Sequence, residues 1–244
     1  MASQKICKSP GDYGLLESGG NVSTAYKTKR QRVIDHGEVF TPPELVNDML
    51  DLVAQECERE DSRFLEPACG DGNFLAEVLR RRLTRIDQKY TPQSQWEAHA
   101  LLGLACLYGI ELLPDNTGIC RQRLSGLFQD HYELRYGAKS KPAVIDAATH
   151  IVGCNIVQGD ALAMTGPKGK PLILTEWALI GGGKFKRRLY AYEELTPVED
   201  KGSLFASASE PVHNEEGTPV FIAQHVRDLP AVHYLNLATE GRES

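Results

Sequence analysis

One stretch constrains the fold of this chain more than any other: a short apolar segment that enters a glycine-rich turn and then a helical pattern. Residues 63–67 (RFLEP) predict a strand, and the turn ACGDGN follows at residues 68–73. From Phe74 to Ile86 the apolar residues recur at helical spacing. A strand, a glycine turn and a helix form the first half of a βαβ unit, so we expect an α/β fold. Such a fold has a mostly parallel sheet with helices on both faces.

The rest of the chain continues this alternation. The spacing of apolar residues predicts helices over 41–53, over 94–106 and from Pro114 onward, and strands over 107–112, 155–158 and 171–179. Residues 132–148 are expected to hold a loop and part of a helix. Only a weak strand, at 220–223, is expected beyond residue 196. We therefore divide the chain into a poorly ordered arm (1–30), one α/β domain (31–195) and an irregular C-terminal extension (196–244).

Composition excludes several classes of protein. A hydrophobic fraction of 41% and a charged fraction of 25% are ordinary for a soluble globular chain. No apolar run is long enough to span a membrane, and the N-terminus lacks the apolar core of a secretory signal. The six cysteines are scattered singly, which argues against a zinc site or another metal site, argues against a disulfide framework, and favours the reducing cytoplasm.

The formal net charge is −6, whereas proteins that hold DNA by charge alone are usually basic. Any contact with DNA must therefore come from local basic patches or from a partner. Three patches are present, at Lys27–Arg32, Arg80–Arg85 and Lys184–Arg188. For each of them, a solvated surface is as good an interpretation as a phosphate-contacting one.

The expected strand ends indicate the ligand, because open α/β sheets bind ligands beyond the carboxyl ends of their strands. The glycine turn carries Glu66 and Asp71, two carboxylates that would repel a phosphate and attract a cation. The ammonium and sulfonium groups of S-adenosylmethionine (SAM) fit that charge. Glu111, at the end of the next strand, suits the hydroxyls of a ribose, and Asp160 suits the amine of an adenine.

Four segments together resemble the N6-adenine DNA methylases of restriction–modification systems. HGEVFTPPELVNDMLD (36–51) resembles the segment that precedes their core, and FLEPACGDGNFL (64–75) resembles their first SAM motif. LYGIELLPDNTGICRQRL (107–124) resembles the second motif, and NIVQGDAL (155–162) the third. A single glycine-rich turn is a weak signal, but four segments in the family's order are a strong one.

The resemblance implies a Rossmann-like methyltransferase fold with SAM as cofactor. It implies that Phe40 and Thr41 touch the methionine end of SAM, and that Glu111 binds the ribose. Asp160 and Ala161 would bind the adenine. The turn beneath the cofactor would be formed by Glu66, Ala68, Gly70 and Gly72.

The pattern breaks at the catalytic motif. The family carries Asn/Asp/Ser-Pro-Pro-Tyr/Phe after its fourth strand, where an oxygen accepts the amino hydrogens of the flipped base and the aromatic ring stacks on it. That tetrapeptide is absent here, and Thr175-Glu176-Trp177 stands at the expected place. Glu176 and Trp177 are candidate catalytic residues, the alternative being that they only end a strand. Gly181–Lys184 is not a P-loop, and we interpret it as a flexible hinge before a basic segment.

These observations predict methyl transfer from SAM to N6 of adenine in DNA, in a restriction–modification or phage context. The expected partners are DNA and a specificity or partner subunit, because the tail is short for a target-recognition domain. Two alternatives stay open. One is a catalytically silent methyltransferase fold that binds SAM, nucleic acid or a partner, and the other is an enzyme that acts on RNA or protein.

Overall fold

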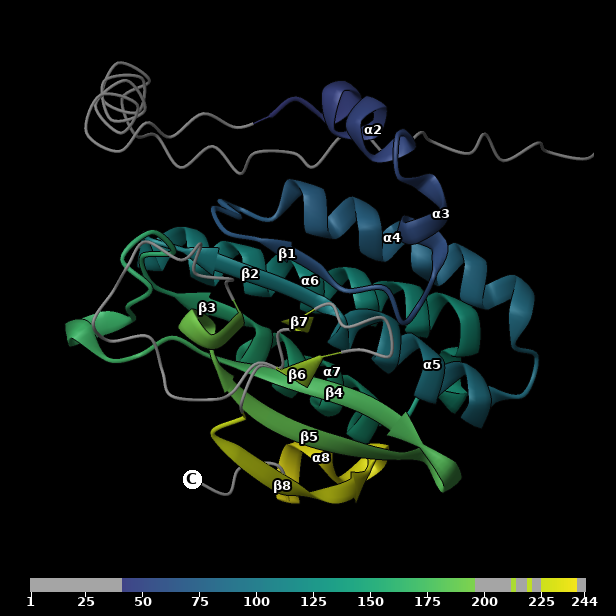
Figure 1. The fold of residues 1–244 in the computed structure, drawn as a ribbon. Coiled ribbons are helices and arrows are strands. Elements are labelled where there is room, and N and C mark those ends of the chain that lie inside the picture. Colours follow the sequence, from purple (N-terminus) through teal and green to yellow (C-terminus); the bar gives the residue numbers. More distant parts are fainter. Residues whose placement is uncertain (1–40, 196–211, 214–218, 221–224, 241–244) are drawn as a thin grey trace, which may run out of the picture. The chain divides into compact units, whose positions relative to one another are not determined.

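The computed structural model describes residues 41–195, 212–213, 219–220 and 225–240 (Figure 1). Phe40, the arm expected at 1–30 and most of the segment 196–224 lie outside these residues. The helices are α2 (Pro43–Asp51), α3 (Ala54–Glu58), α4 (Asn73–Lys89), α5 (Gln93–Ala105), α6 (Pro114–Tyr136), α7 (Pro142–Asn155) and α8 (Leu237–Glu240). The strands are β1 (Phe64–Glu66), β2 (Leu107–Glu111), β3 (Ile156–Gln158), β4 (Ile173–Ile180), β5 (Lys184–Ala191), β6 (Val212–His213), β7 (Pro219–Val220) and β8 (Arg227–His233).

A three-stranded parallel sheet, in the order β1-β2-β3, forms the centre of the fold. Glu66 pairs with Gly109 and Glu111 pairs with Gln158, so all three strands end at one edge. All five residues of β2 are buried. Because successive side chains of a strand point to opposite faces, both faces of β2 are covered. The sequence-based α/β class and the parallel pairing of these strands are confirmed.

Four long helices surround this sheet, since α4, α5, α6 and α7 all contact β2. Their inward faces supply most of the apolar core, in which Leu79, Leu101, Phe128 and Ile151 are fully buried. Residues 132–148 contain a short connection and part of α7, as predicted, together with the last residues of α6, which continues to Tyr136. None of the described helices combines the length and the apolar character that a membrane crossing requires.

A second sheet, β4-β5-β8, is antiparallel throughout. Strand β4 occupies the position expected for the next parallel strand, but it pairs with β5 across the glycines 181–183. Gly182 and Gly183 both have positive φ angles, of 73° and 70°, which a tight reversal requires. The glycine run is therefore the loop of a β-hairpin rather than a hinge, and β4 contacts helices α5 and α7.

The C-terminal part contains more regular structure than expected. Strand β8 completes the second sheet, although the sequence indicated only a weak strand at 220–223, of which Val220 belongs to β7. Tyr234 is buried and donates a 2.7 Å hydrogen bond to Glu97 of α5. Leu237 is fully buried. The description of residues 196–244 as irregular thus fails for 227–240, while the domain limits at residues 30 and 195 stay predictions.

Candidate functional site

The glycine turn between β1 and α4 is held tightly to its neighbours. The Cys69 amide donates to the Ile110 carbonyl of β2, and the Gly72 amide donates to the Cys69 carbonyl. Gly70 and Gly72 have φ angles of 53° and 85°, in the left-handed region that favours glycine. A Cβ atom on Gly72 would lie 2.6 Å from the Cys120 sulfur, so helix α6 leaves no room for a side chain there.

Glu111 joins the end of β2 to this turn. Its Oε2 accepts a 2.8 Å hydrogen bond from the Gly70 amide, and its Oε1 accepts a 2.9 Å bond from the Leu113 amide. The residue is 7% exposed. A carboxylate has about four acceptor positions, so Glu111 keeps capacity for two further donors such as ribose hydroxyls.

Asp71 is neutralised by a residue that the sequence did not indicate. Arg123, on α6, donates to its Oδ2 at 2.8 Å and also hydrogen-bonds the Asn73 side chain. The two partners of the ion pair are 52 positions apart, and no local pattern links them. Asp71 therefore does not serve as a free carboxylate for a cationic ligand, which corrects the expectation of two such groups in the turn.

Glu66, the last residue of β1 before the turn, is the carboxylate that still needs a partner. Its Oε2 is buried and has no hydrogen-bond partner among the described residues. Burial is the main reason why the pKa of Glu66 rises to about 7, and the nearby carboxylates of Asp71 and Glu111 raise it further. A cation bound at this position would satisfy the buried oxygen and favour the ionised form.

Asp160 follows the third strand, β3, at the same edge of the sheet. The amide of the preceding residue, Gly159, donates to the Glu111 carbonyl, which places the ends of β2 and β3 side by side. The Asp160 Oδ1 accepts from the amides of Leu162 and Ala163, and this turn holds its carboxylate in place. Ala161 is half-buried, whereas the Leu162 side chain is 96% exposed.

The structure thus brings together Glu66, Ala68, Gly70, Gly72, Glu111, Asp160 and Ala161 at the carboxyl edge of the parallel sheet. Thr41 lies two residues before the start of α2, which packs against α4, the helix that leaves the turn. Helix α2 begins at Pro43, and no side chain caps its N-terminus. Phe40 lies outside the described residues.

The Cys69 thiol lies inside the turn but has the environment of a structural residue. It is buried, and its side chain contacts the thiol of Cys120. The hydrogen bond between the Cys69 and Cys120 thiols, together with burial, raises the pKa of Cys69 far above its ordinary value. The Cys69 thiol therefore stays protonated. Its sulfur also fills the space beside Gly109, where a Cβ atom would approach it to 2.7 Å.

The structure does not bring Glu176 and Trp177 to this edge. Glu176 forms a 2.5 Å ion pair with Arg63, which precedes β1, and Trp177 donates to Asn155, which precedes β3. Both contacts lie at the amino ends of the parallel strands. Trp177 is 2% exposed and packs edge-on against His150 and Phe185, so its ring is not available to stack on a base. These placements argue against the catalytic roles expected for the pair and agree with the alternative of structural strand residues.

A separate cavity of about 430 Å³ borders the loop that follows Asp160. Residues from β3, from the loop and from the start of β4 line it, namely Val157, Gln158, Gly166, Pro167, Lys168, Lys170, Pro171, Leu172 and Ile173. Neither Glu66 nor Glu111 reaches it, so this cavity is distinct from the site at the glycine turn. Within the described part of the chain, no His, Cys, Asp or Glu side chains form a metal-binding group of three or more.

Comparison with known proteins gives a partial match to a methyltransferase. A stretch of 61 residues, 25% of the chain, is 34% identical to the type II methyltransferase M.VspI of Vibrio sp. (strain 343). The match covers 13% of that protein's length, so most of the relative has no counterpart in it. No protein-family model and no solved structure matches the chain. The comparisons support a relationship to a methyltransferase over a quarter of the sequence.

Proposed function

We propose that this chain binds SAM at the carboxyl edge of its parallel sheet and belongs to a DNA adenine-N6 methylation system with a Rossmann-like methyltransferase fold. One observation carries the proposal. The glycine turn with Glu66, the end of β2 with Glu111 and the end of β3 with Asp160 meet at one edge, and hydrogen bonds through Glu111 link them. The partial identity to a type II methyltransferase supports the same conclusion.

The residues at this edge fit SAM by their chemistry. The buried, unpartnered Oε2 of Glu66 suits a cationic group, while Gly70 and Gly72 keep side chains away from the turn. Glu111 has acceptor capacity for the ribose, and the fixed Asp160 carboxylate can accept from an adenine amine. Bound SAM would supply a methyl group on a positively charged sulfur. The chain's contribution is to orient the cofactor and to match its charge.

The placement of Glu176 and Trp177 favours a second candidate function: SAM binding without methyl transfer by this chain alone. The family's Asn/Asp/Ser-Pro-Pro-Tyr/Phe motif is absent from the sequence, and the residues that stand in its place face the amino ends of the parallel strands. Under this candidate the acceptor-binding groups come from a partner subunit.

Calorimetric titration of the purified chain with SAM tests the binding proposal. We expect saturable binding that Asp160→Asn and Glu66→Gln weaken by about tenfold or more, the effect of losing one charged hydrogen bond. Asp130→Asn, which removes an exposed carboxylate of α6, is the matched control and should bind like the wild type. Absence of SAM binding, or equal losses in the control, would refute the proposed site.

Transfer of a radiolabelled methyl group from SAM to unmethylated DNA, followed by digestion to nucleosides, separates the two candidates. Label in N6-methyladenine supports methylation by this chain. SAM binding without labelled DNA supports the second candidate, in which this chain alone does not transfer the methyl group. Repeating the assay with added lysate from cells that express a specificity subunit then tests whether transfer depends on a partner. Label in RNA or protein instead of DNA would contradict the proposed acceptor.

A further inference from the structure

The structure distinguishes between two of the three basic patches. In the patch on α4, Arg80 and Arg81 form ion pairs with Glu77, and Arg82 is fully buried and donates to backbone carbonyls. Arg85 hydrogen-bonds Gln88. Most of the arginines on α4 therefore already have partners within the protein, and this patch offers few free cations to another molecule.

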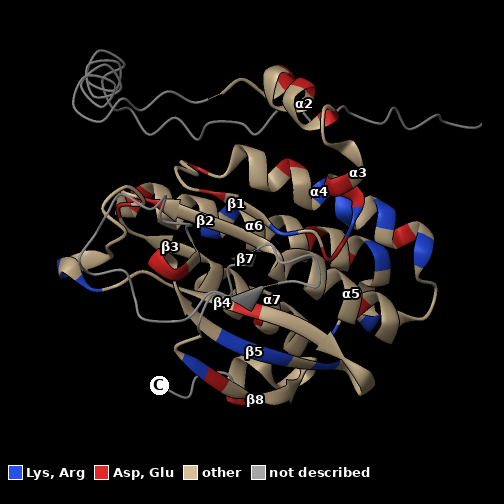
Figure 2. Ribbon diagram, in the orientation of Figure 1, with Lys and Arg blue, Asp and Glu red and all other residues tan. Residues whose placement is uncertain are grey.

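The patch on β5 is arranged differently. Residues of β5 alternate in burial, so Phe185 and Arg187 point inward while Lys184, Lys186 and Arg188 share the outer face. Neither Lys184 nor Lys186 forms an ion pair or a side-chain hydrogen bond with any described residue. Figure 2 shows Lys and Arg along much of β5, the buried Arg187 among them.

Carboxylates of the neighbouring strands offset only part of the positive charge on this face. Arg188 is flanked by Glu176 on β4, at 3.7 Å, and by Asp228 on β8, at 3.1 Å. Arg63 reaches the same Glu176 from the start of β1. Four cations thus meet two carboxylates, which leaves a positive surface on a chain whose net charge is −6. A local excess of positive charge on an acidic protein fits a polyanionic partner.

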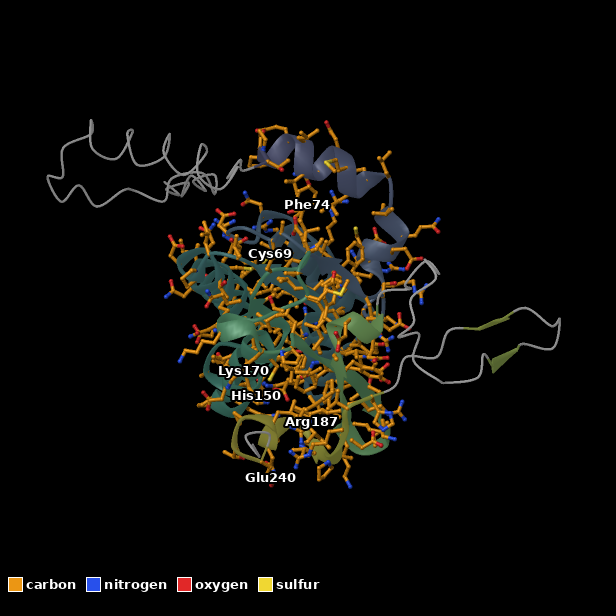
Figure 3. All side chains as sticks on the ribbon, turned by 60° about the vertical axis from the view of Figure 1, so that its left-hand side comes forward. Cys69, Phe74, His150, Lys170, Arg187 and Glu240 are labelled. Atoms are coloured by element: carbon orange, nitrogen blue, oxygen red, sulfur yellow. The ribbon has the colours of Figure 1, made fainter. Side chains whose placement is uncertain are left out.

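We propose that the outer face of the β4-β5-β8 sheet is a nucleic-acid-binding surface on which Lys184 and Lys186 contact the phosphate backbone of duplex DNA. This surface belongs to β5, and Figure 3 shows Arg187 of that strand well away from Cys69 of the glycine turn. Backbone contacts at such a surface position a duplex but do not read its sequence. The surface stands on its own charge pattern, independently of the SAM site.

Fluorescence anisotropy with a labelled mixed-sequence duplex of about 20 base pairs tests this surface. The variant K184Q/K186Q removes the two lysines, and R85Q/K139Q removes two exposed cations elsewhere as the matched control. Each phosphate contact contributes about 0.9 to the slope of log affinity against log salt. We therefore expect K184Q/K186Q to reduce the slope by about 2 between roughly 50 and 200 mM KCl, and to weaken binding at least about tenfold at low salt. The control should retain both values.

Three results would overturn the proposal: no binding of the duplex by the wild type at low salt, equal losses in the two variants, or binding only to vesicles of anionic phospholipid. Both variants must have the same thermal unfolding midpoint as the wild type. A loss of binding can then not be explained by a loss of fold. SAM titration of K184Q/K186Q separates this surface from the proposed function, because SAM affinity should be unchanged. Duplex binding by a chain that fails to bind SAM would refute the proposed function alone.

Discussion

The contact between the glycine turn and helix α6 allows a quantitative prediction for Gly72→Ala. At φ = 85° an alanine is strained by about 1–2 kcal/mol relative to glycine. Its Cβ would also lie 2.6 Å from the Cys120 sulfur, and overpacking of this kind typically costs about 1–3 kcal/mol. We therefore expect Gly72→Ala to lower the free energy of unfolding by about 2–5 kcal/mol. Urea denaturation followed by circular dichroism measures this change.

Two further variants separate the causes. Gly118→Ala, on α6, meets no atom within 4 Å and has helical backbone, so it should stabilise the protein by about 1 kcal/mol. Cys120→Ala removes the clashing sulfur. In that background Gly72→Ala should retain only the backbone strain, of about 1–2 kcal/mol, and the double-mutant cycle should report the difference. Unchanged stability of Gly72→Ala, or an equal cost in both backgrounds, would refute the reasoning.

Three other substitutions have expected outcomes. Trp177→Phe leaves the Asn155 Oδ1 without its donor and should cost about 1–3 kcal/mol in urea denaturation with SAM affinity unchanged; lost SAM affinity at wild-type stability would contradict this. Tyr234→Phe removes the donor to the Glu97 carboxylate and should cost about 1–3 kcal/mol, whereas Thr239→Val, at an exposed position of α8, should cost little. The pKa of Glu66 is about 7 in the folded chain, against an ordinary value of 4.5. Between these pH values the folded state binds more protons than the unfolded state, so the free energy of unfolding falls as pH rises from about 4.5 to about 7. Glu66→Gln should abolish this component, and a stability difference from the wild type that stays constant over that pH range would contradict the assignment.

Much of the candidate site was predictable from sequence because its elements are neighbours along the chain. The strand, the glycine turn and helix α4 follow one another within residues 63–89, and each has its own pattern. The meeting of Glu66, Glu111 and Asp160 follows from one further fact, that parallel strands end at the same edge. Arg123 was not predictable in this way, because its pairing with Asp71 depends on how α6 lies against the turn.

The expectation that β4 would be a further parallel strand failed for a different reason. The apolar run over 172–179 predicts a strand but does not state its partner or its direction, and the family resemblance suggested a further parallel strand. A direct signal was present in Gly181-Gly182-Gly183, since a three-residue glycine loop between two strand-like segments is typical of a hairpin. From Lys184 to Arg187 more exposed residues alternate with buried ones, as in a strand with one covered face.

The antiparallel direction of β4 affects the two parts of the functional hypothesis, cofactor binding and acceptor binding, differently. The cofactor half depends on three strand ends whose convergence the parallel pairing enforces, so it survives the change at β4. The acceptor half depends on where the fourth strand ends, and in this fold β4 carries Glu176 and Trp177 toward Arg63 and Asn155 instead of toward Glu66. Methyl transfer requires both halves at one edge. If the chain transfers methyl groups, the groups that hold the acceptor must therefore come from residues other than this pair, or from a second protein.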